Sequence, residues 1–182
     1  MNTKKINIII IDDHQMMIDG LVAILSTNPD LKILKTYTNG NDFLNEIDNL
    51  QPDIVLSDIS MPQIDGYELT KNIKQKNKSI HVIALSMSNN INDINKMIDA
   101  GIAGYVLKNV GNKELINAIQ KVSNGKMHFS DDVTEEMVKY KNDKPIKEIE
   151  QAKLTERELE ILKLIVQEFS NAEIADTLFI SE

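Results

Sequence analysis

The architecture of this chain can be argued from the run Pro52-Asp53-Ile54-Val55-Leu56-Ser57-Asp58-Ile59-Ser60-Met61-Pro62. Its apolar part has the length of a strand and is apolar at successive positions, as in a strand buried on both faces of a parallel sheet. Asp58 follows this part, so its carboxylate lies at the C-terminal end of the strand. In an open α/β sheet, ligands bind at that edge.

Polar residues follow two other apolar runs in the same way. Asp12-Asp13 come after the run from Ile6 to Ile11, and Lys108 comes after Gly104–Leu107. Each signal is weak alone, because an acidic pair in a loop is usually solvated and a lone lysine is usually at the surface. Their joint position at strand ends is more specific. Three carboxylates and one ammonium at one edge suggest a divalent cation and an incoming phosphoryl group.

Strand-like and helix-like patterns alternate through the first two-thirds of the chain. The expected strands are Ile6–Ile11, Lys32–Tyr37, Ile54–Ser57, His81–Leu85 and Gly104–Leu107. Apolar residues at helical spacing lie between them, and we assign nearly all of these to core packing. The order implies right-handed crossovers. We therefore predict an α/β fold with a five-stranded, doubly wound parallel sheet of the flavodoxin-like kind.

The composition changes near Ser130, and we expect three parts: a sheet domain over residues 1–130, a linker over 131–152 and a partial all-helical domain over 153–182. A short helix is expected over Thr134–Lys141, before Pro145. In the last part, Thr155 and Glu158 form a capping box at the start of an amphipathic helix. A second short helix is expected over Ala172–Leu178.

The overall composition excludes several classes of protein. The chain has 182 residues and no Cys, which rules out disulfides and thiolate metal sites. Its apolar runs are too short to span a bilayer, and its first residues do not resemble a signal peptide, so we expect a cytoplasmic protein without a membrane partner. The net charge of −8 argues against a chain that coats nucleic acid along its length.

The clustered carboxylates suggest a specific chemistry. A carboxylate can attack a phosphoryl donor and form an acyl phosphate, whose charge needs Mg²⁺ and a fixed cation nearby. Mg²⁺ prefers oxygen ligands and keeps several waters. The candidate ligands are Asp12 through a water, Asp13, Asp58 and the backbone carbonyl of Ser60. Lys108 and Ser86, each at the end of a strand, are placed to bind two different phosphoryl oxygens.

At this point the chain resembles a known family. Residues 6–125 resemble the receiver domain of two-component response regulators, and the tail resembles the LuxR-type helix-turn-helix, which together indicate the NarL/FixJ family of transcription factors. The receiver motifs are Ile10-Ile11-Asp12-Asp13-His14, the run 52–62, Asp65-Gly66, Leu85-Ser86 and Ala100-Gly101-Ile102-Ala103-Gly104-Tyr105-Val106-Leu107-Lys108. The tail motifs are Leu154-Thr155-Glu156-Arg157-Glu158, Ile161-Leu162 and Ser170-Asn171-Ala172-Glu173-Ile174-Ala175.

The resemblance implies a role for each matching residue. Asp58 would be the phosphoacceptor, with the acidic pair beside it for Mg²⁺ and Lys108 beside the phosphate. Ser86 would be the hydroxyl that moves toward the phosphoryl group, and Tyr105 the aromatic that turns inward behind it. The implied partners are a cognate sensor histidine kinase, a second copy of the chain, and DNA for the full-length protein. We interpret His14 as a loop residue that caps or packs.

Three positions depart from the family pattern. Met87 follows Ser86 where many receivers carry a small side chain, and its bulk could restrict access of donors or water to Asp58. Asn109 follows Lys108 where many receivers have a cis proline, which leaves the geometry of that loop open. Glu168 stands where a glycine usually ends the helix, so the turn before Ser170 could differ.

The tail stops before the helix that would read DNA. Phe179-Ile180-Ser181 looks like the turn of the motif, and the recognition helix would begin just past it. Residues 153–182 carry three basic and seven acidic side chains, the wrong balance for phosphate contacts. We therefore expect no DNA-binding residue in this chain. It is either a piece of a longer protein or a naturally shortened one, and the sequence does not distinguish these.

Two functions stay open. One is a phosphorylation-gated transcription factor seen without its recognition helix, and the other is a receiver with a degenerate tail that acts only through protein partners. A third class, the aspartate-dependent phosphatases, uses a second Asp two residues after the nucleophile. Position 60 is Ser, so we expect no enzymatic turnover beyond slow self-dephosphorylation of Asp58.

Overall fold

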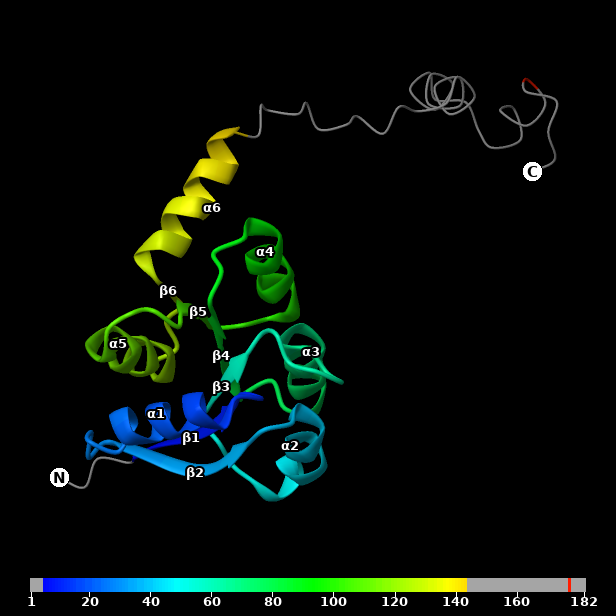
Figure 1. Cartoon of the computed structure of the whole chain (residues 1–182). Coiled ribbons are helices and arrows are strands. Elements are labelled where there is room, and N and C mark those ends of the chain that lie inside the picture. Colours follow the sequence, from blue (N-terminus) through cyan, green and yellow to red (C-terminus); the bar gives the residue numbers. More distant parts are fainter. Residues whose placement is uncertain (1–4, 144–176, 178–182) are drawn as a thin grey trace. The chain divides into compact units, whose positions relative to one another are not determined.

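The computed structural model describes residues 5–143 and Thr177. The first compact unit of the chain, which ends at Lys141, is built on a six-stranded parallel sheet (Figure 1). The strand order is β2-β1-β3-β4-β5-β6. The strands are β1 (Ile6–Ile11), β2 (Leu31–Tyr37), β3 (Ile54–Asp58), β4 (His81–Ser86), β5 (Gly104–Leu107) and β6 (His128–Phe129).

The parallel α/β class is confirmed, but the expected number of five strands is wrong. The sixth strand, β6, pairs with β5 in parallel, with His128 opposite Gly104 and Phe129 opposite Tyr105. A strand of two residues is too short to show an apolar period, so it leaves no pattern in the sequence. The strand β6 is defined by the backbone hydrogen bonds that it forms with the edge of β5.

Helices cover both faces of the sheet. The helical elements are α1 (Gln15–Leu25), α2 (Gly40–Glu46), the 3₁₀ turn η1 (Ile47–Asn49), α3 (Gly66–Lys76), α4 (Ile91–Ala100), α5 (Asn112–Ser123) and α6 (Asp131–Asp143). In Figure 1, α1 and α5 lie on one side of the strands, and α2, α3 and α4 lie on the other. This is the doubly wound arrangement that the alternating pattern predicts.

The two faces of the sheet bury separate apolar cores. Ile8 and Ile10 pack with the buried residues of α1 and α5, whereas Ile9 and Ile11 pack with those of α2, α3 and α4. All four isoleucines are completely buried. Because both faces are covered, the strand is apolar from Ile8 to Ile11, and polar side chains return at the carboxyl edge, where Asp12 begins the acidic pair.

The helix after the sheet is longer than predicted. We expected a helix over Thr134–Lys141, and α6 runs from Asp131 to Asp143. Asp131 and Asp132 occupy its first turn, where negative charge is favoured by the helix dipole. Val133 is fully buried in the core that includes α2, α3 and α4, so this turn is anchored by packing as well. The predicted helices near Thr155 and Ala172 lie outside the described residues.

Candidate functional site

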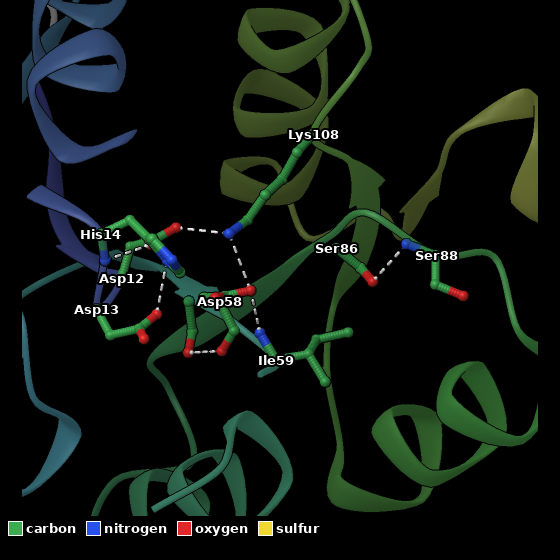
Figure 2. Close-up of polar contacts among 9 residues, drawn as sticks. Asp12, Asp13, His14, Asp58, Ile59, Ser86, Ser88 and Lys108 are labelled. Carbon is green, nitrogen blue, oxygen red and sulfur yellow. Dashed lines mark hydrogen bonds and ion pairs between the residues drawn. The ribbon is translucent and has the colours of Figure 1, made fainter. Parts of the chain in front are cut away.

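Asp58 is the last residue of β3 and is 5% exposed. Its Oδ1 accepts a hydrogen bond of 2.8 Å from the backbone N–H of Ile59, and Lys108 Nζ lies 3.0 Å from the same oxygen (Figure 2). A carboxylate at the carboxyl end of a central strand therefore faces a fixed ammonium. The sequence predicted both the position of Asp58 and its approach to Lys108.

Lys108 joins two buried carboxylates. Its Nζ donates to Asp12 Oδ2 at 2.7 Å as well as contacting Asp58, although it comes 96 positions after Asp12 in the chain. The lysine side chain is 6% exposed and that of Asp12 is fully buried. Burial disfavours the charged ammonium, but its hydrogen bonds to the two carboxylates outweigh this and raise the pKa of Lys108. The lysine is therefore a permanent cation at this edge.

The environment of Asp58 opposes its ionisation. Burial raises the pKa of Asp58, and the charge of Asp12 adds to this effect. Lys108 and a backbone hydrogen bond from Ser60 act in the opposite direction without cancelling the rise. A divalent cation near Asp58 would favour its charged form, because an ion adds a large local positive charge. The electrostatics thus suit a site that is completed by a metal.

Four side chains come close enough to share one ion. Asp12, Asp13, His14 and Asp58 each offer a ligand atom, and these atoms lie within 4.8 Å of one another. Among the described residues, no hydrogen bond reaches the buried Oδ1 of Asp13. A buried oxygen without a donor, beside two further carboxylates, fits a hard cation such as Mg²⁺. That Mg²⁺ binds, and that the Ser60 carbonyl is a ligand, stay predictions.

The structure corrects our interpretation of His14. It occupies the N-cap position of α1, but its side chain makes no capping hydrogen bond and is 72% exposed. Its Nδ1 lies 3.0 Å from Asp13 Oδ1 and 3.4 Å from Asp12 Oδ1. The histidine therefore belongs to the acidic cluster. Its place directly after the acidic pair is the sequence signal for this position.

Ser86 and Tyr105 both bind the loop that follows β4. Ser86 Oγ accepts a hydrogen bond of 3.0 Å from the backbone N–H of Ser88, and the Tyr105 hydroxyl donates to the Ser88 carbonyl at 2.8 Å. Tyr105 is completely buried, so its ring points inward. Burial raises its pKa, against a smaller opposing effect of a side-chain hydrogen bond with Ser86. The sequence did not indicate that Ser88 connects the two.

Two residues that flank the site depart from the family pattern, Met87 and Asn109. Met87 is 76% exposed, and an effect of its bulk on access to Asp58 stays a prediction. The peptide bond between Lys108 and Asn109 is not cis, nor is any other bond among residues 5–143. The Lys108 backbone N–H donates to the Ser86 carbonyl at 2.7 Å, which fixes the end of β5 beside the end of β4.

Gly66 brings the start of α3 against the Asp58 loop. A Cβ atom at this position would lie 2.6 Å from the Asp58 carbonyl oxygen and 2.8 Å from Ile59 Cα, closer than such atoms can approach. The Gly66 N–H donates to the Ile59 carbonyl at 2.9 Å. The missing side chain therefore lets α3 hold the backbone next to Asp58, which explains the Asp65-Gly66 motif.

Comparisons with known proteins agree with this geometry. Residues 8–120 match the family of the response regulator receiver domain, and residues 152–182 match the bacterial regulatory proteins of the luxR family. The chain is 31% identical to the transcriptional regulatory protein DegU of Brevibacillus brevis, over all of this chain and 84% of that protein. It is 33% identical to the response regulator VraR of Staphylococcus aureus, over 97% of this chain and 83% of that protein.

Solved structures of response regulators are also similar to this chain. The response regulator RcsB of Salmonella typhimurium is similar with a TM-score of 0.72 and 28% identity, over 98% of this chain and 85% of that chain. The isolated REC domain of RcsB from Salmonella enterica serovar Typhimurium, with the phosphomimetic BeF3⁻, has a TM-score of 0.68 and 27% identity. That match covers 72% of this chain and 98% of the other.

None of the helices described in the present structure is long and apolar enough to cross a bilayer.

Proposed function

Because this chain belongs to the response regulators that join a receiver domain to a LuxR-type DNA-binding domain, we propose that phosphorylation of Asp58 switches its receiver and thereby controls DNA binding and transcription in the full-length protein. The observation that carries the proposal is the position of Asp58. Its carboxylate is nearly buried at the carboxyl edge of β3, 3.0 Å from a fixed ammonium and beside two further carboxylates.

The geometry supports transfer of a phosphoryl group to Asp58. A carboxylate oxygen attacks the phosphorus of a phosphohistidine on a sensor kinase, a P–O bond forms, and the P–N bond breaks as the imidazole leaves. Mg²⁺ would be held by Asp13, Asp58 and the Ser60 carbonyl, with Asp12 through a water, and supplies positive charge beside the transferred group. Lys108 supplies a second positive charge from the protein itself.

The same contacts suggest how the switch works. Ser86 Oγ now accepts the Ser88 N–H, and on phosphorylation it would turn to donate to a phosphoryl oxygen. Ser88 would then lose one of its two connections to the sheet and keep the one from Tyr105. Asn90, two residues further on, caps the N-terminus of α4 through the Asn92 N–H. A change at Ser86 can therefore be passed to α4 through this short loop.

The domain bounds and partners belong to the same proposal. We assign residues 1–130 to the receiver, 131–152 to a linker and 153–182 to part of the DNA-binding domain. RcsB has been solved as two dimers bound to DNA, which supports a homodimer and DNA as partners here. The luxR-family match of residues 152–182 favours this function over a receiver that acts only through protein partners.

A mass measurement tests the phosphorylation step. The protein is incubated with a small acyl-phosphate donor, with Mg²⁺ or with a chelator, and the intact mass is measured. The mass of one phosphoryl group should be added only with Mg²⁺, and Asp58→Asn should abolish the addition. Asp99→Asn, at an exposed position on α4, is the matched control and should be modified like the natural chain. Equal modification of both variants would overturn the assignment of Asp58.

A further inference from the structure

We propose that a cavity between α1 and α5 is a binding site for a small, neutral, apolar molecule of about the size of one aromatic ring. The cavity has a volume of about 110 Å³ and belongs to the face of the sheet that these two helices cover (Figure 1). Its walls come from α1, α5 and the ends of β4 and β5. The claim goes beyond the proposed function and does not depend on phosphorylation of Asp58.

The cavity lies where α1 lacks an apolar side chain. This helix contributes Met17, Gly20, Leu21 and Ile24 to the walls, at positions i, i+3, i+4 and i+7. That spacing forms the stripe with which an amphipathic helix packs on a core. The other three members of the stripe are apolar, so Gly20 stands where a fourth apolar side chain would be expected. The glycine therefore leaves a gap in the stripe.

The fold itself does not require a glycine at position 20. No atom of the described residues would lie within 4 Å of a Cβ placed there, and the φ angle of Gly20 is not positive. Gly66 differs, because a Cβ there would lie 2.6 Å from the Asp58 carbonyl oxygen. A glycine inside a helix lowers stability relative to alanine. Since Gly20 relieves no clash, we attribute it to the open space that it leaves.

The walls of the cavity favour an uncharged, apolar ligand. They include the buried side chains of Leu21, Leu85, Val106 and Leu115. A charged group in such surroundings would lose its hydration without gaining a partner. Apolar cavities stay dry, and one of about 150 Å³ with similar walls binds benzene. The cavity described here is of the same order, so it can hold a single ring but not a segment of protein chain.

Two described residues with polar side chains, Lys108 and Asn112, also line the cavity. The ammonium of Lys108 is already paired, because its Nζ lies 2.7 Å from Asp12 Oδ2 and 3.0 Å from Asp58 Oδ1. Asn112 is the first residue of α5 and is exposed. Neither side chain therefore calls for an anion in the cavity. A ligand would lie beside the same lysine that contacts Asp58.

Benzene is the probe for the test, and benzoate is its charged analogue. Each is titrated into the natural chain and into Gly20→Leu, Gly20→Ala and Ala23→Leu, and binding is followed by the methyl signals in NMR spectra. Gly20→Leu supplies the side chain that is missing from the stripe. Ala23→Leu is the matched control, because it adds the same side chain at an exposed position of α1 that does not line the cavity.

We expect saturable binding of benzene to the natural chain, with benzoate bound at least tenfold more weakly. Gly20→Leu should weaken benzene binding at least tenfold, and Ala23→Leu should change it by less than twofold. Gly20→Ala should unfold at a higher temperature than the natural chain and keep more of the benzene affinity than Gly20→Leu does. The absence of benzene binding, equal binding of benzoate, or unchanged benzene binding in Gly20→Leu would overturn the proposal.

A second measurement locates the bound ring without any substitution. Nuclear Overhauser effects are expected between the benzene protons and the methyl groups of Leu21, Ile24 and Leu115. Effects confined to Ile73 and Ile94, which lie in the core on the opposite face of the sheet, would overturn the assignment.

The same titration, repeated at several protein concentrations, tests a different occupant. The benzene affinity should not depend on protein concentration. An affinity that falls as the chain is concentrated would mean that a second copy fills the cavity, and this result would also overturn the proposal. None of these measurements uses a phosphoryl donor. A failure of Asp58 phosphorylation would therefore defeat the proposed function and leave the benzene result unchanged.

Discussion

The hydroxyl of Tyr105 donates to the backbone carbonyl of Ser88 at 2.8 Å, across 17 positions of sequence. The tyrosine lies in β5 and the serine in the loop after β4, so one side-chain hydrogen bond ties the loop beside Asp58 to the neighbouring strand. Ser88 is also bound by Ser86 through its N–H. The loop is thus held from both sides.

Tyr105→Phe should loosen the β4–α4 loop without disturbing the core. The ring stays buried, and only the hydrogen bond to Ser88 is lost, which we expect to lower the free energy of unfolding by about 1 kcal/mol. Urea denaturation measures this change. Tyr67→Phe is the control, because Tyr67 is only partly buried and its ring contacts the exposed Lys71. Equal effects of the two substitutions would contradict the special role of the Ser88 contact.

Asp13→Ala should weaken Mg²⁺ binding more than Asp12→Ala does. Asp13 Oδ1 is buried and accepts no hydrogen bond from the described residues, whereas Asp12 already accepts a hydrogen bond from Lys108. Titration with Mg²⁺ at constant ionic strength decides the order. The reverse order would mean that Asp12 is the direct ligand and that Asp13 acts through a water.

Lys108→Met should destabilise the receiver in the absence of metal. It leaves two buried carboxylates without their ammonium, and breaking a buried pair in this way costs about 3 kcal/mol. Adding Asp12→Asn to Lys108→Met should restore part of the loss, because one uncompensated charge is removed. Thermal or urea unfolding of the single and double variants gives the coupling. Strict additivity of the two substitutions would contradict the ion pair seen here.

His128 should make stability depend on pH in the mildly acidic range. Burial, helped by Lys121 and opposed by Asp131, lowers the pKa of His128, so the folded state favours the neutral ring. The unfolded chain then binds more protons, and the free energy of unfolding should fall as pH drops below the ordinary histidine pKa of about 6.5. The pKa of His81 is lowered as well. Burial and Lys74 lower it, and Asp53 opposes them.

Urea unfolding between about pH 7.5 and pH 5.5 measures this dependence around the histidine pKa. The free energy of unfolding should depend less steeply on pH in His128→Gln and in His81→Gln. The double variant should show the largest change. Glu114 Oε1 lies 3.9 Å from His128 Nε2 and would stabilise a protonated ring, which opposes the effect. If the free energy of unfolding depended more steeply on pH in His128→Gln, the effect of the Glu114 carboxylate on His128 would outweigh that of burial.

Ser130→Ala should destabilise the junction between β5 and α6. Ser130 Oγ accepts the buried N–H of Leu107 at 3.2 Å, and alanine would leave that group unpaired at a cost of about 1–3 kcal/mol. Amide hydrogen exchange at Leu107 should quicken in the same variant. Ser123→Ala removes an exposed serine hydroxyl that donates within α5, and we expect a change of less than about 0.5 kcal/mol there.

Much of the fold could be predicted because the strands are buried on both faces. The bounds of β1 and β5 agree with the predicted runs Ile6–Ile11 and Gly104–Leu107, and β3 extends one residue past the predicted Ile54–Ser57 to include Asp58. Apolar runs of this length that are followed at once by polar residues are typical of strands buried on both faces of a parallel sheet. The approach of Lys108 to Asp58 then follows from the parallel order of the strands.

The features that could not be predicted depend on backbone pairing or on side-chain direction. β6 has two residues and is defined by its partner in β5. The contact of Ser88 with Tyr105 uses a backbone carbonyl, which no residue type reveals. The direction of the His14 ring toward Asp13 depends on the N-cap conformation of α1. Sequence patterns report burial well, but they carry little information on such local geometry.

The sixth strand connects β5 to the start of helix α6. Phe129 pairs with Tyr105, Ser130 N–H donates to the Tyr105 carbonyl at 3.1 Å, and α6 begins at the next residue. With 13 residues, α6 is about 20 Å long at 1.5 Å per residue. A tilt of about 10° at its first turn would therefore carry its far end through about 3 Å. A small displacement of β5 would therefore be larger at the far end of α6 than at its first turn.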